Sequence, residues 1–97
     1  MKFTFGGTEY ELKYNNFTLL QIEEQLNKPI LSVVSDPEEL NKLTTMNAIV
    51  YCGIVSEKPS FEDFVNSVHQ NEILGVQEEL GSLITASFNT GEEVKKK

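Results

Sequence analysis

KFTFGGTEYELKY, residues 2–14, is the stretch that decides the fold of this chain. Phe3 and Phe5 alternate with other residues, which places them on one face of a first strand. Tyr10, Leu12 and Tyr14 alternate in the same way and share one face of a second strand. The glycine pair between the two runs tolerates the positive φ of a tight turn. The pattern predicts a β-hairpin with one aromatic face, and this face must pack on other elements because two strands alone are marginal in water.

After the hairpin the sequence has the start and stop signals of a first helix. Asn15 or Asn16 caps its start, and it runs to about Leu26, before Asn27 and Pro29. Its buried side is predicted to carry two apolar residues, with three more as further candidates: Phe17 and Leu20, then Leu19, Ile22 and Leu26. The run ILSVV that follows is either one helical turn or an irregular packed segment.

The strongest helix start is SDPEEL, residues 35–40. Asp36 is placed as the N-cap, Pro37 takes the first helical position, and two glutamates face the positive end of the helix dipole. We expect this helix to continue to about Ser56, and its nearly all-apolar end, AIVYCGIV, is typical of a centrally buried segment. The predicted apolar side consists of Leu40, Leu43, Ala48, Val50, Tyr51 and Ile54.

Two further helices complete the predicted fold. Ser60 and Asp63 form a near capping box for a helix with Phe61, Phe64, Val65 and Val68 on one stripe. The last helix covers about residues 72–88, with glycines in its interior that weaken it. The sequence therefore predicts one mostly helical α+β domain, residues 1–88, with an N-terminal hairpin followed by about four helices. Residues 89–97 contain one apolar residue and are predicted to be a flexible tail.

The composition argues against several functional classes. The formal net charge is -7, and 13 of the 15 acidic residues but only five of the eight lysines lie in residues 1–88. Binding to nucleic acid or to anionic membranes needs clustered cations, so we expect neither partner. Because no apolar run approaches the roughly 18 residues of a membrane span and no signal peptide is evident, we expect a soluble intracellular protein.

Candidate residues for catalysis or metal binding are few. The lone cysteine, Cys52, has apolar neighbours and is interpreted as a core residue, and the lone histidine, His69, as a surface residue. Adjacent acidic pairs on helices point about 100° apart and chelate poorly. We therefore expect no enzymatic activity, no cofactor and no metal site.

The apolar stripe of the last helix is the predicted partner-binding face. We expect it to contact a client protein or a second copy of the chain, because its glycines make the helix dependent on packing. The alternative is that the same residues simply belong to the core, in which case charged substitutions at Val76 and Leu80 would unfold the domain. The predicted face consists of Ile73, Val76, Leu80, Leu83 and Ile84.

Three patterns follow one another along residues 2–88: a hairpin of the form K-F-T-F-x-G-x-E-Y-x-L-K-Y, the run L-x-K-P-I, and A-x-x-x-x-G-x-x-x-x-x-P. In this order they resemble the tail assembly chaperones of long-tailed phages and of the prophages derived from them. The resemblance implies a non-enzymatic protein that binds the tape measure protein, keeps it soluble and helps to recruit tail tube subunits. It also implies a place in the host bacterial cytoplasm and absence from the mature virion, and a homo-oligomer is compatible with the length of such a client.

Two alternatives stay open at this point. A small acidic regulatory module, antirepressor-like or mimicking nucleic acid, would bind a basic partner with strong salt dependence. The tail ending in Lys95, Lys96 and Lys97 is either a solubilising end or the trace of a slippery codon run. The second interpretation follows from the resemblance, since many members of the family are made in two forms by a programmed ribosomal frameshift, and the longer form would be the one that contacts the tail tube protein.

Overall fold

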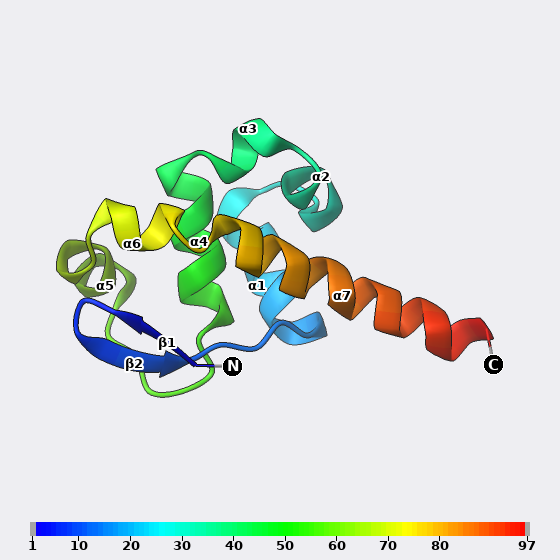
Figure 1. Cartoon of the computed structure of the whole chain (residues 1–97), viewed down its shortest axis with the longest axis horizontal. Helices are drawn as coiled ribbons and strands as arrows, with labels where there is room; N and C mark the ends of the chain where they lie inside the picture. Colours follow the sequence, from blue (N-terminus) through cyan, green and yellow to red (C-terminus); the bar gives the residue numbers. More distant parts are fainter. Residues whose placement is uncertain (1, 97) are drawn as a thin grey trace.

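The computed structural model of the chain describes the backbone of residues 2–96 and the side chains of residues 2–87. A two-stranded hairpin is followed by helices that surround one central helix (Figure 1). The elements are β1 (Lys2–Phe5), β2 (Thr8–Glu11), α1 (Asn16–Leu26), α2 (Ile30–Val34), α3 (Pro37–Leu40), α4 (Leu43–Gly53), α5 (Phe61–Ser67), α6 (Gln70–Leu74) and α7 (Gln77–Lys96). The prediction of a mostly helical α+β domain that begins with a hairpin is confirmed.

The hairpin is antiparallel and has the predicted aromatic face. Phe3 pairs with Tyr10, and the turn places Gly6 at φ 59° and Gly7 at φ 80°, which non-glycine residues rarely adopt. The rings of Phe5 and Tyr10 lie 6.3 and 5.7 Å from the ring of Phe64 in α5. The aromatic face of the hairpin is thus buried against α5.

Helix α4 is the centre of the core, as the run AIVYCGIV predicts. Met46, Ile49 and Val50 are each at most 1% exposed, and α4 contacts α1, α3, α5 and α6. Tyr51 adds ring contacts to α5, with centroids 5.2 Å from Phe61 and 5.5 Å from Phe64. Burial on several sides explains why this segment is apolar almost all round.

The described residues contain seven helices where about four were predicted. The helix predicted from Asp36 to about Ser56 is two helices, α3 and α4, because Lys42 takes an extended backbone with ψ 133° and interrupts the ladder of hydrogen bonds. Leu43, predicted to be on the apolar side, is 40% exposed at the start of α4. The run ILSVV is the single helical turn α2.

The last predicted helix is likewise two helices, α6 and α7, separated at Gly75 and Val76. Gly75 caps α6, its N–H bonding to Asn71 O. Helix α7 passes along the body and its backbone continues beyond Phe88 to Lys96, past the other elements (Figure 1). The side chains of residues 88–97 lie outside the described residues, so the flexible tail stays a prediction.

Among the helices of residues 2–96, none combines the length and apolar character that crossing a membrane requires.

Candidate functional site

The residues predicted to form the partner-binding face lie inside the molecule. Ile73 and Leu80 are each 1% exposed and Ile84 is fully buried, while Val76 and Leu83 are half-buried and pack against the same core. All five therefore face the core of the single chain. Contact between a partner and the buried residues of this set would require α6 and α7 to leave this position, and such contact stays a prediction.

Five large apolar side chains among residues 2–87 are exposed: Leu31, Leu43 and Val55 outside α1, and two on α1 itself. Phe17 is 66% exposed and Leu20 is 50% exposed, and the two side chains lie one helical turn apart. The prediction that these two residues belong to the buried side of the helix is wrong. The further candidates Leu19 and Ile22 are buried, as predicted.

The hydrogen bonds at the start of α1 explain which side of the helix faces the core. Asn15 and Thr18 form a capping box: the N–H of Thr18 donates to Asn15 Oδ1 at 3.0 Å, and the N–H of Asn15 donates to Thr18 Oγ1 at 2.9 Å. Thr18 Oγ1 also donates to Lys13 O at 3.0 Å, which draws Thr18 inward until it is 2% exposed. With Thr18, Leu19 and Ile22 inside, the centre of the buried side lies more than about 100° from Phe17, which therefore faces outward. The polar residue at the third position of the cap was the sequence signal for this arrangement.

A hollow of about 410 Å³ adjoins the exposed side of α1. It is lined by Gln21, Glu24 and Gln25 of α1, by Tyr51 and Cys52 of α4, and by Lys58. Lys58 Nζ donates to the carbonyl oxygens of Tyr51 at 3.0 Å and Ile54 at 3.4 Å, at the C-terminal end of α4, where a positive charge is favourable. Lys58 is thus engaged in holding the end of this helix.

The thiol of Cys52 is a poor nucleophile in this environment. Its side chain is buried, as predicted, and burial raises the pKa of the thiol above its ordinary value, with Lys58 opposing the effect. A thiol that stays protonated near neutral pH reacts slowly. The structure therefore supports a packing role for Cys52.

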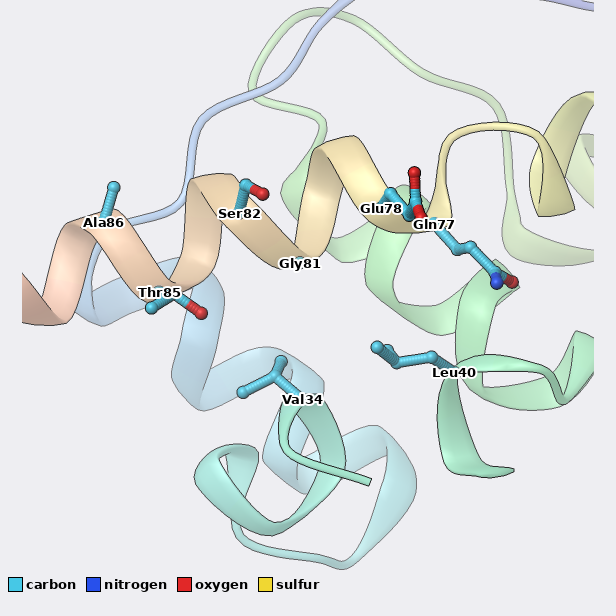
Figure 2. A pocket seen from close by; sticks show the side chains of 8 residues that line it. All are labelled: Val34, Leu40, Gln77, Glu78, Gly81, Ser82, Thr85 and Ala86. Atoms are coloured by element: carbon cyan, nitrogen blue, oxygen red, sulfur yellow. The ribbon is translucent and has the colours of Figure 1, made fainter. Parts of the chain in front are cut away.

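A second concavity, of about 550 Å³, lies between α7 and the α2–α3 segment. Figure 2 shows Val34 and Leu40 directed towards α7, with Gly81 and Thr85 on the facing side of that helix. A Cβ atom added at Gly81 would lie 3.8 Å from Leu40 Cδ1, an ordinary van der Waals contact. The small side chains on α7 leave this groove open.

The carboxylate of Glu39 in α3 accepts hydrogen bonds from three side chains outside this helix. Its Oε2 atom accepts hydrogen bonds from Lys28 Nζ at 2.7 Å and from Lys42 Nζ at 3.0 Å, and its Oε1 atom accepts one from Thr45 Oγ1 at 3.0 Å. These bonds, that of Lys28 first, lower the pKa of the Glu39 carboxyl to about 2. The carboxylate therefore stays ionised and ties together the residues on either side of α2 and α3.

Among the described side chains there is no group of three or more histidine, cysteine, aspartate and glutamate residues placed to hold a metal ion. His69 is exposed, and its Nδ1 atom accepts the N–H of Asn71 as the N-cap of α6. Glu72 accepts the N–H groups of His69 at 2.9 Å and Gly6 at 3.1 Å, and these bonds lower the pKa of its carboxyl. In this way Glu72 joins the hairpin turn to α6.

The residues that carry the family resemblance have structural roles. Tyr14 Oη donates to Ile49 O at 2.9 Å in the core, and a Cβ atom at Gly53 would lie 2.5 Å from the Tyr14 ring. Pro29 and Ile30 of the L-x-K-P-I run begin α2, with Pro29 as its N-cap residue. Comparisons with protein-family models, with curated proteins and with solved structures found no match.

Proposed function

We propose that this protein is a non-enzymatic tail assembly chaperone that binds a tape measure protein, keeps it soluble and helps to recruit tail tube subunits. The resemblance of residues 2–88 suggests the client. The observation that carries the proposal is the exposed pair on α1, where Phe17 is 66% and Leu20 is 50% exposed. An apolar helix face of this kind can cover the apolar face of a helical client.

The size of this patch bears on how the client is held. Fully burying a Leu or Phe side chain contributes about 1.5–3 kcal/mol, so the exposed fractions of Phe17 and Leu20 together offer roughly 2–3.5 kcal/mol. Association itself costs about 4–15 kcal/mol. Since the pair alone does not offset this cost, we infer that the client contacts further surface or that many copies line it together, as in a homo-oligomer.

The charge of the chain fits a solubilising role. With a net charge of -7, each bound copy adds negative charge to an apolar client and opposes aggregation. In this proposal the protein acts in the host bacterial cytoplasm and is absent from the finished virion. Contact with the tail tube protein is assigned to a frameshifted longer form of the protein.

The same charge favours one alternative, an acidic regulatory module that binds a basic partner. Charge-driven binding weakens strongly with salt, because the Debye length falls from about 10 Å at 0.1 M to about 3 Å at 1 M. Burial of apolar surface does not weaken in this way. Salt dependence therefore separates the two functions.

The test is co-expression with the tape measure protein encoded by the same phage or prophage, followed by affinity capture at about 0.1 M and about 1 M salt. The proposal predicts that the tape measure protein stays soluble and is captured at both concentrations. Capture at low salt alone would favour the acidic module, and an insoluble tape measure protein would refute the proposal. A tape measure gene directly downstream is the expected gene order.

A further inference from the structure

We propose that α2 and α3, residues 30–41, form a strap that opens as a unit while the rest of the domain stays folded, and that Glu39 is its latch. The two helices lie together at one edge of the molecule (Figure 1). Helices of five and four residues are not stable alone, so the strap depends on what it touches.

The strap is weakly anchored in the core. α2 buries Ile30 and Val33, whereas α3 buries no side chain completely; Val34 and Leu40 are half-buried and pack against the same core. Leu31 on the outer side of α2 is 58% exposed. Segments with few buried apolar side chains open at lower free energy than the core around them.

The latch joins the two ends of the strap. Glu39 binds Lys28, which precedes the strap, and Lys42 and Thr45, which follow it. At the first end Glu23 Oε2 also accepts the N–H of Ile30 at 2.7 Å. Charged contacts at a surface are individually weak, so a latch of this kind releases without disturbing the core.

The groove of Figure 2 is the seam along which the strap parts from α7. Val34 and Leu40 of the strap face Gly81 across it, and Gln77 Nε2 donates to Asn41 Oδ1 at 3.1 Å near one end. Moving the strap outward widens this groove and uncovers the core side chains beneath Ile30 and Val33.

The role of the strap in client binding rests on the proposed function, whereas its opening does not. If the protein is a chaperone, the core side chains that opening uncovers are a second apolar surface for a helical segment of the client, which the exposed pair on α1 alone does not supply. Opening itself is a property of the chain and is measured without any client.

The first test is amide hydrogen exchange of the full chain, followed residue by residue by NMR. The N–H groups of Val33 and Leu40, bonded to Pro29 O and Asp36 O, report on the strap, and those of Ile49 and Val50 report on α4. We expect protection of the strap amides to be at least about tenfold lower than that of the α4 amides. Equal protection in the two groups would mean that the strap opens only on global unfolding and would overturn the proposal.

The second test changes the latch. Glu39→Gln should speed exchange of the strap amides by about tenfold, because a charged acceptor of three bonds is lost, while the α4 amides change little. Glu38→Gln removes the same charge from an exposed position in the same turn but none of these three bonds, so it is the matched control and should speed strap exchange by about fivefold at most, through the helix dipole alone. Equal effects of the two variants on the strap would remove Glu39 as the latch.

The third test fills the groove between the strap and α7 with a larger side chain. Gly81→Leu places a side chain against Leu40 and should slow the exchange of the strap amides relative to the α4 amides. The same variant should lower the fluorescence of the neutral apolar dye Nile red, because less apolar surface is uncovered. Glu39→Gln should raise this fluorescence. An unchanged ratio of strap to α4 exchange in Gly81→Leu would contradict the seam. If these tests fail, the strap proposal is refuted, but the wild-type chain can still capture the tape measure protein. The strap proposal and the chaperone proposal therefore fail independently.

Discussion

Replacing Leu80 by alanine tests whether α7 closes the core. Leu80 is 1% exposed, and truncating a buried leucine to alanine costs about 2–5 kcal/mol through lost burial and the cavity left behind. A domain of this size has about 5–15 kcal/mol of stability in total. Leu80→Ala therefore removes a large share of the stability. Leu20→Ala makes the same chemical change at a position that is 50% exposed and should cost about 0.5 kcal/mol or less.

The measurement is urea unfolding of wild type and both variants, followed by far-UV circular dichroism and tyrosine fluorescence. Coincident transitions from the two probes and equal slopes against urea make the free energies comparable. A loss below about 1 kcal/mol in Leu80→Ala would refute the core assignment. It would favour the prediction that Leu80 belongs to a partner-binding face.

Three further predictions concern two core residues, Tyr14 and Gly53, and the carboxylate of Glu39. Burial raises the pKa of the Tyr14 hydroxyl far above its ordinary value of 10.0. The contribution of Tyr14 to the free energy of unfolding is therefore fully present below about pH 10 and decreases as the pH rises further. Tyr14→Phe should lower the unfolding free energy by about 1 kcal/mol and flatten this alkaline decline, both measured by urea unfolding across pH. Gly53→Ala should cost about 1–3 kcal/mol, seen as a lower melting temperature, because its Cβ meets the ring of Tyr14; an unchanged melting temperature would contradict that contact. The lowered pKa of Glu39 stabilises the fold above about pH 4.5, and this contribution is lost as pH falls towards 2, so Glu39→Gln should reduce the pH dependence in that window.

The elements that local chemistry dictates were predictable. The glycine pair and the alternating aromatic residues give the hairpin, Asp36 with Pro37 gives the start of α3, and the run AIVYCGIV gives the buried helix. Each of these signals acts within a few residues. The helix break at Lys42 lacks such a signal. The break at Gly75 has one, because glycine is common at the C-terminal end of a helix, but this glycine was predicted to lie in a helix interior.

The partner-binding face was harder to predict, because burial depends on which side of a helix meets the core. Apolar residues on α1 occupy two sides, and counting them does not tell which side is inside. The bond from Thr18 to Lys13 O settles it for α1 and leaves Phe17 outside. On α7 the glycines suggested a helix that needs a partner, but the domain itself provides the packing for Leu80 and Ile84.

The most direct test of the proposed function is co-expression of the tape measure protein with a chain that carries Phe17→Asp and Leu20→Asp. The matched control is Val55→Asp, which adds a charge at a side chain 49% exposed outside α1. We predict that the double variant folds with wild-type circular dichroism yet leaves the tape measure protein insoluble, while the Val55→Asp variant keeps it soluble. A folded double variant that still keeps the tape measure protein soluble would contradict the assignment of the α1 face as the client-binding surface.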